Sequence, residues 1–334
     1  MTPETTAHTI LAPDSKAALP GEFAGSDLLR DPARFVIELD EAERRELRSI
    51  LTSLERDGGS LHIEKHVHGV MRHVTDRSRR MLSYGDGVVL MRGVPTADVD
   101  RDTLAVLFTY LGTALGVPSA QKLDGELVTD IRDVGADATD PEVRLYRTRA
   151  EQDFHTDGAD VIGLLCLHPA AVGGLSRIVS SVRVYRRIAE ERADLASLLF
   201  EPWLFHLPGA RELGLPGAIS RPIATFDGHK LESFFVGWYI RRAEMLGLTP
   251  ALDGPRRELL ALYEKTANDP ELYLDMSFRP GDVQWLRNAF VLHKRTAYED
   301  APSPTPKRHL LRLWLSASYV NDSTPRFTHA ESHL

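Results

Sequence analysis

Cysteine is almost absent from this chain of 334 residues, and long apolar runs are missing altogether. The single cysteine, Cys166, excludes an intrachain disulfide and any zinc site built from several cysteines. No apolar stretch approaches the roughly 20 residues that a membrane-spanning helix needs, so we expect no contact with a membrane. An excess of basic residues is also lacking: 40 Lys and Arg stand against 48 Asp and Glu, a net charge of −8. This balance argues against a nucleic-acid binder, which needs a basic face.

The first residues lack the features of a secretion signal, because no charged start is followed by an apolar core in MTPETTAHTILAPDSKAALPGEF. We therefore expect a cytoplasmic protein. The composition is that of an ordinary globular protein, with 43% hydrophobic and 26% charged residues. No repeat or linker divides the chain. We expect a flexible N-terminal arm over residues 1–30, one domain over 31–320 with a helical insert at about 185–275, and a C-terminal tail over 321–334.

Helical and strand-like patterns alternate along the chain. Apolar residues at helical spacing predict helices over 40–57, 61–80, 100–116, 185–200 and 252–270. Short apolar runs bounded by glycine, proline or polar turns predict strands over 85–95, 126–134, 147–157, 161–170, 176–185, 283–286 and 308–319. Asp227-Gly228 between two further strand-like runs predicts a hairpin. Many short strands with tight turns favour an α+β, β-rich fold around a closed double sheet of the jelly-roll kind.

The segment FHTDGAD, residues 154–160, has the spacing of a metal site. Residues i and i+2 of a strand face the same side, so His155 and Asp157 can direct an imidazole nitrogen and a carboxylate oxygen at one point. His293, which follows the turn RPGD and the strand VQWL, is the best candidate for a third ligand. Two imidazoles and one carboxylate on one face suit iron(II). The alternative is a His-x-Asp pair in a solvated turn.

A second group of histidines competes with this one in the segment HIEKHVHGVMRH. Its members are His62, His66, His68 and His73. His62 and His66 can share a helix face, but the zinc-protease motif needs glutamate directly after the first histidine, where this chain has Ile63. We interpret the group as a charged helix surface. We interpret the remaining candidates as ordinary polar or core histidines: His168, His206, His229 and His309.

Taken in order, the motifs resemble the iron(II)/2-oxoglutarate-dependent dioxygenases of the TauD/TfdA (taurine dioxygenase) superfamily, in particular its clavaminate-synthase-like branch. The resemblance covers residues 85–320, through the segments GDGVVLMRGVP, FHTDGAD, GGLS, RPGDVQWLRNAFVLHKR and PKRHLLRLWL. It implies a double-stranded β-helix of the cupin-like kind. It also implies that His155, Asp157 and His293 bind Fe(II), and that 2-oxoglutarate and O2 are co-substrates.

The resemblance further implies a 2-oxoglutarate site. Arg308 stands in the place of the arginine that binds the distal carboxylate, and Ser176, which follows Gly173-Gly174, in the place of a hydroxyl partner that is threonine in many relatives. Arg312, four residues further, stands in the place of a second arginine that lies near the keto-acid end of 2-oxoglutarate or the substrate, and it can face the same way as Arg308. A planar guanidinium suits this task because it meets a carboxylate with two parallel hydrogen bonds. The alternative for both arginines is a basic strand end that faces solvent.

The reaction implied by the resemblance is hydroxylation of an unactivated C–H bond in a small amino-acid-like or natural-product substrate, with release of succinate and CO2. Halogenating relatives carry a small residue where this chain has Asp157, so we do not expect halogenation. Desaturation, cyclisation and epoxidation use the same ligands and remain alternatives. A catalytically silent barrel that binds a small acid or a metal is the alternative from another class.

Substrate specificity is expected to reside in the loops at the barrel mouth: 119–134, the segment after Asp157, and 205–245. Candidate substrate contacts are Gln121, Asp160 and Arg241. Lys294 and Arg295, next to His293, are either surface charges or substrate contacts. The expected partner is a small molecule, and the sequence does not indicate an oligomeric state.

Overall fold

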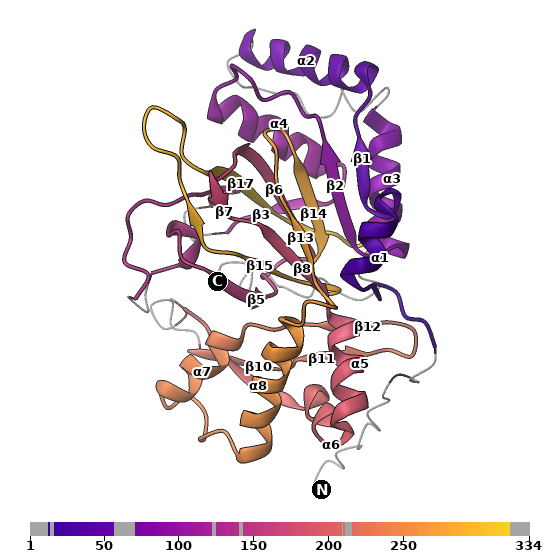
Figure 1. Ribbon diagram of the computed structural model, residues 1–334, viewed down its shortest axis with the longest axis vertical. Helices are drawn as coiled ribbons and strands as arrows, with labels where there is room; N and C mark the ends of the chain where they lie inside the picture. The colour runs from indigo at the N-terminus through magenta and orange to yellow at the C-terminus, as the bar shows by residue number, and fades with distance from the viewer. Residues whose placement is uncertain are drawn as a thin grey trace, which may run out of the picture.

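The computed structural model describes residues 13, 17–56, 71–121, 125–139, 143–208, 210 and 216–320. Two β-sheets form its centre (Figure 1). The larger has the strand order β1-β2-β14-β6-β17-β3, with β4 also paired to β17. Its strands are β1 (Val36–Glu38), β2 (Val88–Arg92), β3 (Val117–Ser119), β4 (Val128–Ile131), β6 (Val161–His168), β14 (Val283–Arg287) and β17 (His309–Ser316). The smaller has the order β13-β8-β15-β5, with β5 (Gln152–His155), β8 (Ser176–Ser180), β13 (Leu274–Met276) and β15 (Val291–Arg295).

The path of the chain through these sheets confirms the expected double-stranded β-helix. From β5 onward the chain crosses repeatedly between the smaller and the larger sheet, since β5, β8 and β15 belong to one and β6, β14 and β17 to the other. This alternation is the jelly-roll arrangement. It places β5 and β15 side by side and antiparallel although many residues separate them in the sequence. Two short strands, β7 (Val172–Gly173) and β16 (Tyr298–Glu299), pair at the rim.

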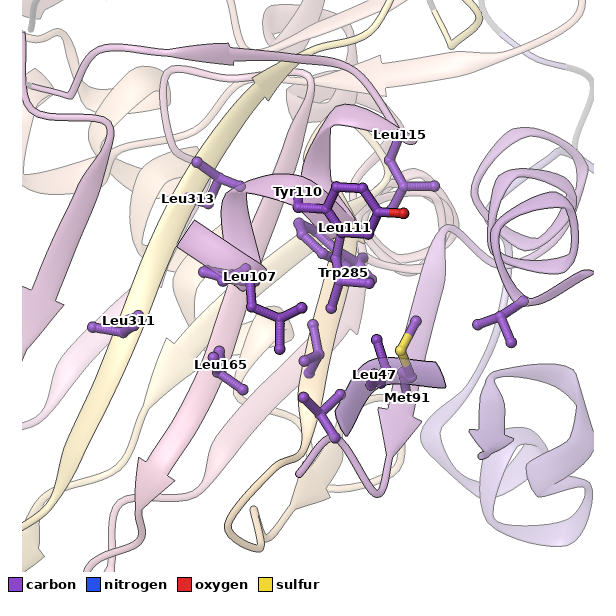
Figure 2. Close-up of a cluster of buried hydrophobic side chains, with 14 of the residues drawn as sticks. Leu47, Met91, Leu107, Tyr110, Leu111, Leu115, Leu165, Trp285, Leu311 and Leu313 are labelled. Atoms are coloured by element: carbon purple, nitrogen blue, oxygen red, sulfur yellow. The ribbon is translucent and has the colours of Figure 1, made fainter. Parts of the chain in front are cut away.

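Three helices pack on one face of the larger sheet: α2 (Glu41–Arg56), α3 (Met71–Tyr84) and α4 (Arg101–Thr113). As predicted, α4 begins after Asp100, whose carboxylate accepts hydrogen bonds from the backbone N–H groups of Asp102 and Thr103. Leucines of α4 pack on Trp285 of β14 and on leucines of β6 and β17 (Figure 2). Of the second histidine group, His73 is exposed on α3, while the other three lie outside the described residues.

The insert between β8 and β13 forms a second lobe, at the bottom of Figure 1. It contains α5 (Ser181–Glu191), α6 (Ala193–Ala196), β9 (Pro202–His206), β10 (Ala218–Pro222), β11 (Ala224–Phe226), β12 (Leu231–Ser233), α7 (Gly237–Met245) and α8 (Gly254–Ala267). Strands β11 and β12 confirm the predicted hairpin around Asp227-Gly228. The strand predicted over 176–185 is wrong in its second half: helix α5 begins at Ser181, because the hydroxyl of Ser180 accepts a hydrogen bond from the Arg183 N–H and caps the helix.

The later part of the predicted N-terminal arm packs on the domain. Helix α1 (Gly25–Arg30) follows the buried Phe23, itself buries Leu28, and is held by a hydrogen bond from the Gly25 N–H to the Leu272 carbonyl. The predicted tail, 321–334, lies outside the described residues. None of the helices in the described ranges is both long and apolar enough to cross a bilayer.

Candidate active site

His155, Asp157 and His293 meet at the end of the smaller sheet. The register of β5 and β15 sets His293 directly opposite His155. Asp157 Oδ1 lies 3.8 Å from His155 Nε2, and Asp157 Oδ2 lies 3.7 Å from His293 Nε2. One ligand atom from each residue lies within 4.8 Å of the other two. Two imidazoles and one carboxylate around one point form the arrangement that suits iron(II) and leaves further coordination positions open.

The protonation of His155 is fixed by its neighbours. Its Nδ1 lies 2.7 Å from the carbonyl oxygen of Asp153, which can only accept, so Nδ1 carries the proton. Nε2 then keeps its lone pair, to which the side-chain amide of Gln152 donates at 3.2 Å. A hydrogen bond from the second ring nitrogen is the usual way in which proteins orient a metal-binding histidine.

Asp157 is held through both its backbone and its carboxylate. Asn288, which follows β14, accepts a hydrogen bond from the Asp157 N–H at 2.8 Å and donates to its carbonyl oxygen at 2.6 Å. The indole N–H of Trp314 donates to Oδ2 at 3.1 Å, and the Arg312 guanidinium lies 3.3 Å from the same oxygen. Oδ1 faces the unprotonated Nε2 of His155 and accepts no hydrogen bond from the residues that the structure describes.

Burial and charge put all three side chains in their metal-binding forms. Burial lowers the pKa of His155, and burial together with the neighbouring His155 lowers the pKa of His293 to about 3. Burial alone would raise the pKa of Asp157, but the positive charge of Arg312 and the hydrogen bond from the Trp314 indole bring it below the usual value. Neutral imidazole and ionised carboxylate are the forms that bind a divalent metal.

A small cavity of about 50 Å³ adjoins the two histidines of the site. Its walls are Ile131, Tyr146, Gln152, His155, Ile162, Leu164, Leu175, Ser176, Phe278, His293, Lys294, Arg295, Arg308, Leu310 and Arg312. The three residues that the sequence assigned to 2-oxoglutarate, Ser176, Arg308 and Arg312, are therefore brought together beside the histidines. The Ser176 hydroxyl donates to Gln284 Oε1 at 3.0 Å and can also accept a hydrogen bond.

Arg308 is buried with an unsatisfied donor. Its side chain is 4% exposed, its guanidinium lies over the ring of Tyr298 at 5.0 Å, and Nη1 has no hydrogen-bond partner among the described residues. Burial lowers the pKa of Arg308. A Cβ on Gly174 would lie 2.9 Å from Arg308 Nε, so the glycine leaves room for the guanidinium. A buried cation with an unpaired N–H is costly unless an anion joins it, and the cavity beside Arg308 fits a carboxylate.

Arg295 is a site residue that the sequence left undecided. It is buried, and its Nε and Nη1 have no hydrogen-bond partner among the described residues. Its Nη2 donates to the carbonyl oxygens of Leu145 and Ala150. Burial and the nearby Arg308 lower the pKa of Arg295 to about 10. The signal was present in the spacing, since residue i+2 of a strand faces the same side as His293.

Lys294, between these two residues on β15, has a different place. Its ammonium group donates to Asn268 Oδ1 at 2.8 Å and lies 2.7 Å from a carboxylate oxygen of Glu151. These contacts tie β15 to the end of α8 and to the residue before β5. Lys294 is therefore not an unpaired surface charge. Its ammonium group also points to Asn268 and Glu151, not to the metal ligands.

Gln121 lies behind Arg312 and not in the large cavity. It is 1% exposed, its Oε1 accepts from Arg312 Nε at 2.7 Å, and its amide nitrogen donates to the carbonyl oxygens of Leu127 and Arg312 at 2.8 Å each. A direct contact of Gln121 with substrate stays a prediction. Its observed hydrogen bonds fix the direction of the Arg312 guanidinium.

Replacing Gln121 with leucine is expected to loosen Arg312. The change leaves Arg312 Nε and two carbonyl oxygens without their partner, so we expect the free energy of unfolding to fall by about 1–3 kcal/mol. Urea unfolding measures this loss. Gln121→Glu, which keeps the acceptor for Arg312, should retain more of the stability than leucine does. Equal stability of wild type and Gln121→Leu would contradict the role of Gln121 in holding Arg312.

The other two candidate substrate contacts occupy different surroundings. Asp160 is buried, and its carboxylate accepts a hydrogen bond from the Ala317 N–H at 2.8 Å, next to the end of β17. It does not line the large cavity. Arg241, on α7, does line it and forms an ion pair with Glu264. Contact of either residue with substrate stays a prediction.

The large cavity measures about 490 Å³ and lies between two of the ligands, His155 and Asp157, and the insert. It is lined by Ala138, Val143, Arg144, Leu145, Tyr146, Gln152, His155, Thr156, Asp157, Gly158, Phe205, His206, Leu207, Pro208, Ile219, Phe234, Val236, Trp238, Tyr239, Arg241, Arg242, Met245, Arg312 and Trp314. Residues of 205–245 supply much of the wall, as expected of a specificity region. The described residues of 119–134, which are 119–121 and 125–134, supply none of this wall, and Ile131 lines the small cavity.

Comparison of the sequence with known proteins finds similarity to oxygenases. Residues 70–314 match the family described as "Taurine catabolism dioxygenase TauD, TfdA family". The chain is 31% identical to FR-33289 synthase of Streptomyces rubellomurinus over 241 residues, which cover 70% of each protein. It is 28% identical to the taurine hydroxylase-like protein SAT17 of Stachybotrys chartarum over 294 residues, which cover 84% of this chain and 74% of that protein.

Solved structures share the fold. An asparagine oxygenase in complex with Fe(II), 2S,3S-3-hydroxyasparagine and succinate superposes with a TM-score of 0.61 at 16% identity. The non-heme iron oxygenase OrfP in complex with Fe and alpha-ketoglutaric acid superposes with a TM-score of 0.65 at 17% identity. Each comparison covers 84% of this chain and 93% of the other. At these identities the likeness concerns the fold.

Proposed function

Because the chain belongs to the TauD/TfdA family of iron(II)/2-oxoglutarate-dependent dioxygenases, we propose that it hydroxylates an unactivated C–H bond of a small amino-acid-like or natural-product substrate. The observation that carries the proposal is the meeting of two cavities at the three ligands. Tyr146, Gln152, His155 and Arg312 line both. A co-substrate in the small cavity and a substrate in the large one would therefore both reach the same point.

The proposed roles follow from these positions. His155, Asp157 and His293 would hold iron(II). The small cavity would hold 2-oxoglutarate, with Arg308 on its distal carboxylate and Ser176 and Arg295 as further hydrogen-bonding partners. When bound there, iron(II) supplies, with 2-oxoglutarate and O2, the oxidation of the C–H bond, and succinate and CO2 are released.

The chain itself would contribute orientation and exclusion of water. Arg312 offsets the charge of Asp157 and, held by Gln121, borders both cavities. Trp238 stands with its ring centroid 5.0 Å from that of His155 and shields it on the side of the large cavity. A dry, preorganised site of this kind holds a C–H bond near the metal without competing water.

The nature of the relatives supports the substrate class. FR-33289 synthase is named for a product, and the structural neighbours are named with hydroxylated asparagine and arginine. A catalytically silent barrel is less well supported, because buried arginine N–H groups without partners in the small cavity are costly unless a ligand uses them.

The test is anaerobic loading with iron(II) and 2-oxoglutarate, followed by exposure to O2. We expect a visible charge-transfer band from the chelate before O2 is added, and succinate formation afterwards that increases with a suitable substrate. N-oxalylglycine, a 2-oxoglutarate analogue, should suppress the succinate. Failure to bind 2-oxoglutarate, together with no succinate across a broad panel of amino acids and their derivatives, would refute the proposal.

A further inference from the structure

The large cavity is rich in cations and poor in anions. Among the described residues that line it, Asp157 is the only carboxylate, and it is directed at the two histidines. Four arginines line the same cavity: Arg144, Arg241, Arg242 and Arg312. We propose that the substrate is an organic anion with a flat apolar body and without a free ammonium group. This inference rests on the proposed function and narrows its substrate class to natural products and amino-acid derivatives without a free amino group.

The walls favour a flat apolar body. Six aromatic side chains line the cavity: Tyr146, Phe205, Phe234, Trp238, Tyr239 and Trp314. Leu145, Leu207, Ile219, Val236 and Met245 add aliphatic surface. The volume of about 490 Å³ lies within the ~300–1,000 Å³ of pockets that enclose drug-sized ligands. The cavity therefore has room for a molecule larger than a small free amino acid.

The arginines differ in the hydrogen bonds and ion pairs that their side chains already form. Arg312 binds Asp157 and Gln121, and Arg241 is paired with Glu264. The side chain of Arg144 is half-buried at the cavity and forms no hydrogen bond or ion pair with the residues that the structure describes. Arg144 is therefore the first candidate to bind an anionic group of the substrate.

Arg144 lines the cavity together with Tyr239 and acts on that wall residue. Burial raises the pKa of the Tyr239 phenol, and the positive charges of Arg144 and Arg312 oppose that rise. Both guanidiniums are thus close enough to act on one wall residue. An anion between them gains charge-assisted hydrogen bonds, whereas an ammonium group meets like charge and finds no free carboxylate among the described lining residues.

The test uses probes that share one aromatic body and differ in charge. N-acetyl-L-phenylalanine is an anion, L-phenylalanine a zwitterion and L-phenylalaninamide a cation. Titration calorimetry under anaerobic conditions, with iron(II) and 2-oxoglutarate present, gives their dissociation constants. We expect the anion to bind at least about tenfold more tightly than the cation, because one charge-assisted hydrogen bond contributes enough binding free energy for that difference. Phenyl phosphate and benzenesulfonate are tested in the same way, to compare a phosphate and a sulfonate with the carboxylate.

A charge-removing variant tests the assigned residue. Arg144→Gln should weaken binding of N-acetyl-L-phenylalanine about tenfold and leave that of L-phenylalaninamide unchanged or tighter. Arg45→Gln, which removes the same charge from the exposed face of α2, is the matched control and should alter neither. Arg144→Lys should restore part of the affinity for the anion.

Two results would overturn the inference. One is equal or tighter binding of the cation, or no measurable binding of any anionic probe at millimolar concentration. The other is an unchanged preference for the anion both in Arg144→Gln and in a variant with Arg144, Arg241 and Arg242 all replaced by glutamine. These binding measurements need no turnover. Failure of wild-type protein to form the 2-oxoglutarate chelate counts against the proposed function instead.

Discussion

Asp157→Ala is expected to abolish turnover and to weaken iron(II) binding by more than 100-fold. Loss of a residue that merely supports a metal ligand typically costs ~10–100-fold in affinity, and the loss of a ligand should exceed that range. Asp157 supplies the single carboxylate among the three ligands, and both of its oxygens face histidine nitrogens. Equilibrium competition with a metal-sensitive dye measures the affinity, and succinate formation measures the turnover.

The same substitution should destabilise the apo protein. It removes the carboxylate that faces the buried guanidinium of Arg312 and accepts from the Trp314 indole. Removing one partner of a buried ion pair costs about 3–5 kcal/mol. We therefore expect Asp157→Ala to unfold at lower urea concentration than wild type.

A double variant separates stability from metal binding. Asp157→Ala with Arg312→Met removes both charges, so part of the lost stability should return while iron binding does not. Asp157→Asn, which preserves the shape, should also fail to bind iron tightly. If Asp157→Ala or His293→Ala kept full iron affinity and turnover, the assignment of the three ligands would be wrong.

The sequence predicted which polar side chains lie together better than it predicted the contacts around them. His155 and Asp157 were predictable because a strand directs residues i and i+2 to one side, and His293 because its motif follows FHTDGAD in the family's order. The jelly-roll core, the membership of the family and the cofactors are confirmed. The roles of the individual residues stay predictions, although the structure brings the proposed metal ligands and 2-oxoglutarate contacts together.

The features that the sequence did not predict correctly depend on contacts between distant parts of the chain. Gln121 and Asp160 were candidates because they lie in loops expected at the barrel mouth, yet the first binds Arg312 and the second the Ala317 N–H. Their partners are far away in the chain, so local pattern contains no trace of them. Val182 and Val184 favour a strand by propensity, but the cap at Ser180 and burial against the insert make that segment helical.

Arg308→Leu is expected to weaken 2-oxoglutarate binding by about 100-fold or more. Hydrogen bonds to charged groups contribute ~1.5–3 kcal/mol each, and a guanidinium–carboxylate fork contains two of them, where ~1.4 kcal/mol corresponds to tenfold. Arg308→Lys keeps the charge but cannot form two parallel hydrogen bonds, so its affinity for 2-oxoglutarate should lie between that of Arg308→Leu and that of wild type. Titration of the chelate band with 2-oxoglutarate under anaerobic conditions gives all three affinities.

Stability supplies the second readout for Arg308, and it distinguishes a ligand-binding role from a structural one. The guanidinium is buried, and its Nη1 has no hydrogen-bond partner in the part of the chain that the structure describes. If it is held for an anion, Arg308→Leu removes an uncompensated charge and should leave the apo protein as stable as wild type or more stable. Added 2-oxoglutarate and metal should then raise the melting temperature of wild type but hardly that of the variant. A structural arginine would give the reverse: a clear loss of apo stability and unchanged stabilisation by 2-oxoglutarate.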